Sequence, residues 1–165
     1  MSLTDAMLRE MEQEAHATRR LLERLPEDKL SWKSHSKSFS LGQLALHIAQ
    51  LPGFIPAMAA QDVFEAPQFH QPEAQSREET LRTLEEGLVT AKGILSAMDD
   101  VKVVEPWTLL LNGKPVMTVP RLEVLRTILL NHYYHHRGQL SVYLRLLDVP
   151  LPSIYGPSAD ESPFG

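Results

Sequence analysis

Three of the seven histidines of this chain lie within five residues, in the segment NHYYHHRGQL at positions 131–140. On a helix, His132 and His136 lie about 40° apart around the axis, so both imidazoles share one face. This four-residue spacing is a common way for a helix to offer two nitrogen ligands to one metal ion. His132 with His135 is also geometrically possible, but His132 with His136 fits the apolar face of the helix better. We therefore expect His135 not to be a ligand.

A third imidazole comes from another part of the chain. His47 falls between Leu44 and Leu51 at helical spacing, where a helical bundle would normally place a leucine. Three neutral histidines in an apolar interior would bind Zn²⁺ or a similar ion and leave its fourth position open. An ion with an open position lowers the pKa of a bound water or thiol, which is typical of catalysis. The alternative is that each histidine is a hydrogen-bonded core residue.

Four segments have the periodicity of amphipathic helices and would position these histidines. The first begins at Ser2 or Thr4 and ends near Leu25, and the second begins after Ser40 and buries Leu44, His47, Leu51, Phe54 and Met58. The third begins at a capping box formed by Ser76 and Glu79 and extends to Met98. The fourth begins at Pro120 and ends near Leu147, with an expected buried seam of Leu122, Leu125, Leu129, His132, His136, Gln139, Tyr143 and Leu146.

The connections between these segments complete the predicted fold. Asn112-Gly113 between two β-prone runs predicts a small hairpin before the last helix, and residues 62–75 are expected to form a loop. The sequence therefore predicts an all-α, up-down-down-up or similar four-helix bundle with a β-hairpin insertion, as one domain over residues 1–165.

The composition limits the classes of function. A net charge of -5 and an isoelectric point near 5.8 argue against a nucleic-acid partner. The chain contains no cysteine, which excludes thiolate ligands and a cysteine nucleophile. No apolar stretch is suited to a signal peptide or a membrane span, so we expect a cytoplasmic protein without a membrane partner. The apolar residues Leu109, Leu110 and Leu111 of the hairpin favour a homodimer.

The segments SLGQLALHIAQL and NHYYHHRGQLSVYLRLLDVPLP resemble the DinB family of DNA-damage-inducible four-helix bundles, and the tail IYGPSADE resembles a segment of one branch of that family. The resemblance covers nearly the whole chain. It implies a metal held by one histidine of the second helix and two of the last, which are His47, His132 and His136 here. It also implies that Gly138 permits a close helix approach. Characterised relatives are similar to metal-dependent transferases that use low-molecular-weight thiols.

Three functions are compatible with these observations. The first is a transferase that holds a low-molecular-weight thiol on a divalent metal, with Zn²⁺ or Ni²⁺ expected, and joins it to a small-molecule electrophile; Arg137 would contact the carboxylates of the thiol. The second is a hydrolase that uses metal-bound hydroxide, with Asp160 or Glu161 of the tail folding back as general base. The third is a stress-induced bundle that binds a metal or ligand without turnover.

Overall fold

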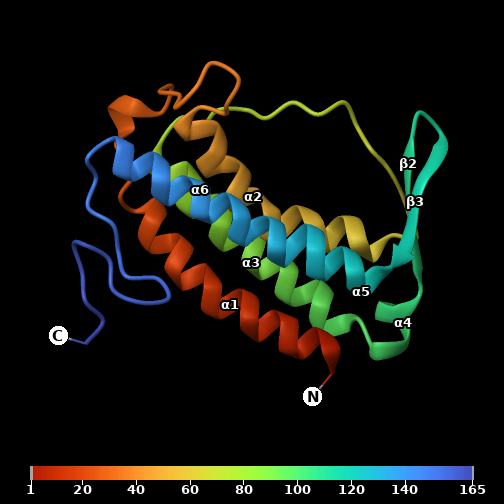
Figure 1. The fold of residues 1–165 in the computed structure, drawn as a ribbon. Coiled ribbons are helices and arrows are strands. Elements are labelled where there is room, and N and C mark those ends of the chain that lie inside the picture. Colours follow the sequence, from red (N-terminus) through yellow and green to blue (C-terminus); the bar gives the residue numbers. More distant parts are fainter. Residues whose placement is uncertain (1, 165) are drawn as a thin grey trace.

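The computed structural model describes residues 2–164 and contains the four predicted helical segments (Figure 1). Three of them are α1 (Leu3–Leu22), α2 (Leu41–Ala60) and α3 (Arg77–Ala97). The fourth consists of α5 (Arg121–Val124), a π-helical segment (Leu125–Asn131) and α6 (His132–Leu146). A 3₁₀ turn (Glu27–Lys29) follows α1, and the short helix α4 (Asp100–Val104) follows α3.

Serine side chains begin the first three helices, because their hydroxyl groups accept bonds from amide groups that have no partner within the helix. Ser2 and Ser40 each form a complete capping box with the third residue of the helix. Ser76 accepts a bond from the Glu79 amide, but the Glu79 carboxylate accepts from the Gln75 amide instead of completing the box. The three starting points predicted from the sequence are therefore confirmed, with Ser2 as the first cap.

The helices pack along their lengths around one core (Figure 1). The hydroxyl of Thr4 donates to the carbonyl of Met98, and Arg19 pairs with Glu85, so α1 and α3 run antiparallel. Helices α2 and α3 run parallel and come very close where Gly53 faces Gly87. A Cβ atom added to Gly87 would lie 2.9 Å from the amide nitrogen of Gly53.

A three-stranded sheet lies at one end of the helices (Figure 1). The predicted hairpin is present as β2 (Pro106–Leu111) and β3 (Lys114–Pro120), and Asn112 and Gly113 form its turn with positive φ angles of 51° and 72°. The prediction of a loop over residues 62–75 is wrong at its start, because β1 (Val63–Glu65) pairs in parallel with β2. The fold is mostly helical but not all-α.

The expected burial is wrong in two places. Phe54 of α2 is 49% exposed instead of buried. In the last helix the predicted seam fails beyond the histidines, where Leu146 is 58% exposed. A π-helical turn holds about one residue more than an α-helical turn, so the residues that follow are rotated about the axis. The buried positions of α6 are Tyr133, Arg137, Leu140 and Leu144.

Candidate metal centre

The structure brings together the three histidines that the sequence singled out. His47 of α2 and His132 of α6 face each other, with their Nε2 atoms 3.5 Å apart. The Nε2 atom of His136 lies 2.7 Å from that of His132. The three side chains are half-buried, and one nitrogen from each falls within 4.8 Å of the others. In the part of the chain that the structure describes, this is the group of histidine and acidic side chains suited to a metal ion.

The spacing of the nitrogens fits tetrahedral coordination with one adjustment. Zinc–nitrogen bonds of about 2.0–2.1 Å in a tetrahedron place two ligand nitrogens about 3.3–3.4 Å apart. The separation between His47 and His132 matches that value. The separation between His132 and His136 is shorter, so these two rings would move slightly apart around an ion.

The second nitrogen of each ring faces an oxygen atom. His47 Nδ1 lies 2.9 Å from Gln71 Oε1, His132 Nδ1 lies 3.3 Å from the carbonyl oxygen of Ile128, and His136 Nδ1 lies 2.7 Å from Gln139 Oε1. A carbonyl oxygen only accepts, so Nδ1 of His132 carries the proton and donates it. Gln71 Oε1 favours the same tautomer at His47, and Gln139 Oε1 would favour it at His136, which leaves Nε2 of each ring available to a metal. Metal-ligating histidines typically have such partners, which fix the ring orientation and tautomer.

The orientation of the Gln71 amide is independently determined. Its Nε2 atom donates to the backbone carbonyl of Pro72 and to Oε1 of Gln50. Because the Pro72 carbonyl is an acceptor only, the amide nitrogen must face it and the amide oxygen must face His47. His47 Nδ1 is therefore the donor, and its Nε2 is the atom available to a metal.

Electrostatics also favours the neutral, metal-binding form of these rings. Burial lowers the pKa of His47 and His132, and it lowers the pKa of His136 to about 4. Removal from water penalises the charged imidazolium. The mutual repulsion of the rings acts in the same direction at His47 and His136. The lowered pKa values favour the neutral rings, whose Nε2 atoms can bind a cation. The residues present therefore fit a divalent metal.

No sequence pattern marks Gln71, although this residue is 5% exposed and contacts His47 directly. The segment that carries it is fastened to the start of α2. Gln43, the capping-box residue of α2, donates to the backbone carbonyl of Gln71, and Ser40 donates to Glu73. A Cβ atom on Gly42 would lie 2.9 Å from Cγ of Glu73, so a glycine is needed there. No periodicity marks a residue in such a connection.

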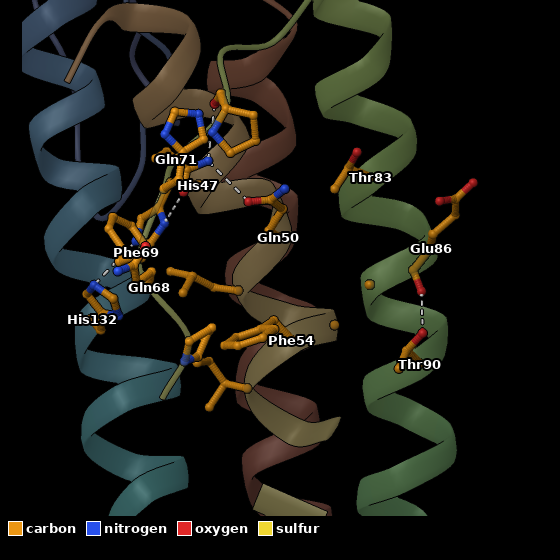
Figure 2. Close-up of a pocket in the computed structure, with 17 residues that line it drawn as sticks. His47, Gln50, Phe54, Gln68, Phe69, Gln71, Thr83, Glu86, Thr90 and His132 are labelled. Carbon is orange, nitrogen blue, oxygen red and sulfur yellow. Dashed lines mark hydrogen bonds between the residues drawn. The ribbon is translucent and has the colours of Figure 1, made fainter. Parts of the chain in front are cut away.

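A cavity of about 640 Å³ opens beside the histidines, between α2, α3 and the connection at residues 67–72 (Figure 2). His47 and His132 form one end of it. The aromatic rings of Phe54 and Phe69 line the cavity and are exposed. Phe69 packs edge-on against His47, with the two ring centroids 6.1 Å apart. A cavity of this size accommodates a small organic molecule next to the metal position.

Arg137 does not lie where the sequence analysis placed it. We expected it to contact the carboxylates of a thiol, but its side chain is only 2% exposed and pairs with Glu14 of α1 at 2.6 Å. It also donates to the hydroxyl of Tyr155 and packs against the rings of Tyr134 and Tyr155. The guanidinium is turned toward α1 and the tail, away from the cavity. Its charge is satisfied there, because a buried arginine requires a partner.

The tail carboxylates are also held away from the histidines. Asp160 pairs with Arg145, and Glu161 pairs with Arg20 and Arg24. These ion pairs fix the tail against α1 and α6, so the predicted fold-back of a general base is wrong. His135 is exposed and is not among the three converging rings. Gly138 is exposed too, and a Cβ atom there would meet nothing within 4 Å, so it permits no close helix approach.

Within residues 2–164, no helix combines the length and the apolar character needed to cross a membrane.

Comparisons with known proteins agree with this architecture. The family model described as the DinB family matches residues 1–163. The uncharacterized protein YrdA of Bacillus subtilis (strain 168) is 26% identical over 163 residues, covering 95% of this chain and 90% of YrdA. A solved DinB-like protein from Bacillus cereus ATCC 10987 has a TM-score of 0.71 at 22% identity, covering 92% of this chain and 97% of its own. The DinB-like protein YjoA of Bacillus subtilis has a TM-score of 0.69 at 18% identity, and the match covers 90% of this chain and 97% of the YjoA chain.

Proposed function

The chain belongs to the DinB family, and on that premise we propose that it is a metal-dependent transferase that joins a low-molecular-weight thiol to a small electrophile. His47, His132 and His136 would hold one divalent transition metal, with Zn²⁺ or Ni²⁺ as the best candidates for a set of three imidazoles. The observation that carries the proposal is the convergence of three Nε2 atoms whose rings already donate through Nδ1.

The residues around the centre have separate tasks in this proposal. Gln71, the Ile128 carbonyl and Gln139 hold the three imidazole rings in the orientation that a ligand needs. The aromatic side chains Phe54 and Phe69 supply an apolar wall for the partner substrate. When bound, the metal would act as a Lewis acid that lowers the pKa of a thiol at its open position.

A transferase is favoured over a hydrolase by the absence of a suitable base. Hydrolysis normally needs a general base beside the attacking water. Among the described residues that line the cavity, the single carboxylate is Glu86 of α3, and Figure 2 shows its carboxyl group turned away from the histidines. Conjugation of a thiol that is already ionised needs no such base.

Cobalt-loaded protein provides the test, because a thiolate on Co²⁺ gives a charge-transfer absorption band. We expect this band on addition of mercaptoethanol, and we expect the zinc- or nickel-loaded protein to accelerate conjugation of the thiol to chlorodinitrobenzene. His132→Ala should abolish both. Metal that raises the melting temperature, with no thiol band and no conjugation, would overturn the proposal in favour of a non-catalytic binding bundle.

The assembly state is part of the proposal. Of the three hairpin leucines on which the expected homodimer rests, Leu109 and Leu110 are half-buried and only Leu111 is exposed. A homodimer therefore stays a prediction, and light scattering that gives a monomer would exclude it. The cytoplasmic location and the lack of a nucleic-acid partner also stay predictions.

A further inference from the structure

A chain of hydrogen bonds leads from the metal centre into the cavity, and its direction is fixed. His47 Nδ1 donates to Gln71 Oε1 at 2.9 Å, and Gln71 Nε2 donates to Gln50 Oε1 at 3.2 Å. The Pro72 carbonyl holds the Gln71 nitrogen on the side of Gln50. Gln50 must therefore accept with its oxygen, because a donor facing a donor would be repulsive.

This direction leaves the Gln50 amide nitrogen as a donor with no partner among residues 2–164. Figure 2 shows that nitrogen on the side of Gln50 that faces α3, away from Gln71. Gln50 is half-buried and lines the cavity. Two N–H groups at a fixed position can therefore be offered to a hydrogen-bond acceptor of a bound molecule.

The rest of the cavity limits the charge of that molecule. The described residues that line it include no lysine or arginine. Arg137, which we expected to contact the carboxylates of a thiol, is buried against Glu14 on the other side of α6. Exposed Phe54 and Phe69 provide flat apolar walls. Apart from a metal ion at the histidines, no group that lines the cavity offers an anion a counter-charge to offset its lost hydration.

We propose that this cavity binds the electrophile, and that the electrophile is an uncharged compound with a flat apolar body and a carbonyl-type oxygen that accepts from Gln50 Nε2. Gln50 is then a residue that determines specificity, and Gln71 fixes its orientation from the metal side. The inference rests on the proposed function only in calling the ligand an electrophile, since the binding site for a hydrogen-bond acceptor follows from the hydrogen bonds and the lining residues.

Two probes of nearly equal shape test the inference without thiol or turnover. Acetophenone carries the carbonyl oxygen, and ethylbenzene has a methylene group in its place. Ligand-observed NMR titration of zinc-loaded protein gives the ratio of their dissociation constants. Gln50→Glu keeps the oxygen that accepts from Gln71 and removes the N–H donor. In Gln50→Glu, we expect acetophenone to bind about fivefold more weakly relative to ethylbenzene than it does in the wild type. Gln50→Met should do the same, while Gln68→Met, at another lining position, should leave the ratio unchanged.

The outcomes are separable from those of the proposed function. Failure of acetophenone to bind the wild type, or an equal ratio in wild type and Gln50→Glu at equal zinc content, overturns the inference. A changed ratio in Gln68→Met of the same size also overturns the role of Gln50. The ratio could change as expected while no thiol band forms on the cobalt protein. That result would support the Gln50 binding site and contradict the proposed transferase activity.

Discussion

The Nε2 atoms of His47 and His132 lie 3.5 Å apart, although 85 residues separate these histidines in the chain. The contact spans the interface between α2 and α6, and neither ring has a proton to share across it. Two free lone pairs at this distance repel each other unless a cation lies between them. The packing of α2 against the last helix therefore places the histidines at the spacing of a metal site. A cation bound between the rings would remove the repulsion of their lone pairs.

Loss of one ligand should remove the metal. We expect about one equivalent of a transition metal in purified wild type and almost none in His132→Ala, because two imidazoles bind far more weakly than three. His135→Ala is the matched control, since His135 is an exposed neighbour whose ring lies outside the converging set. Elemental analysis of the three proteins makes the comparison. Equal metal in wild type and His132→Ala would contradict the site.

Gln71 should act on metal affinity through His47. Gln71→Leu removes the acceptor of the His47 Nδ1–H group, and loss of such partners typically weakens metal binding by about 10–100-fold. Competition with a chromogenic chelator measures the affinity. Gln68→Leu is the control, because Gln68 lines the same cavity and makes no hydrogen bond to the described histidines. Equal affinities in the two variants would show that Gln71 does not position the ring.

Arg137 should matter for stability and not for metal binding. Arg137→Met removes the charged partner of the Glu14 carboxylate, which is 14% exposed, and leaves it the hydrogen bond from the Tyr155 hydroxyl. Breaking a buried ion pair costs about 3 kcal/mol or more. Arg145→Met breaks the exposed pair with Asp160 and should cost less than about 1 kcal/mol. Urea unfolding measures both values, with metal content determined on the folded fraction. A folded, stable Arg137→Met protein that has lost its metal would restore a role for Arg137 at the centre.

Two glycines of α3 should respond in opposite directions to the same change. Gly87→Ala places a methyl group 2.9 Å from the Gly53 backbone, so α2 and α3 must separate at a cost of about 1–3 kcal/mol. Gly93→Ala meets nothing within 4 Å and should stabilise the helix by about 1 kcal/mol, because alanine loses less backbone entropy than glycine. Chemical unfolding of both variants tests the prediction. Changes of the same sign would show that α2 and α3 are not held at this close approach.

The docking of the tail should weaken in acid. Hydrogen bonds from Arg20 lower the pKa of Glu161 below its usual value. A lowered folded-state pKa contributes stability above the unfolded value, near about 4.3, and that contribution is lost as pH falls through the folded-state pKa. The melting-temperature difference between wild type and Glu161→Gln should therefore be greatest near neutral pH and disappear once the pH falls below the folded-state pKa of Glu161. A difference that grows toward acid would contradict the sign.

Features of this protein that depend on local spacing could be predicted from its amino-acid sequence. Serine residues before apolar-periodic segments predicted where α1, α2 and α3 begin, and Asn112-Gly113 predicted the hairpin turn. The four-residue spacing of His132 and His136, with His47 on another buried face, predicted the three histidines that converge in the candidate metal centre. These patterns are readable because a helix or a hairpin turn is specified by neighbours within a few residues.

Tertiary structure decided what depends on contacts between distant segments. Gln71 reaches His47 only because Gln43 and Ser40 hold its segment to α2. The strand β1 forms because β2 is there to pair with it. The π-helical segment rotates the residues that follow, which buries Arg137 and exposes Leu146. Periodicity indicates which residues share a face, but packing determines what that face meets, and so the geometry of the cavity belongs to the folded chain alone.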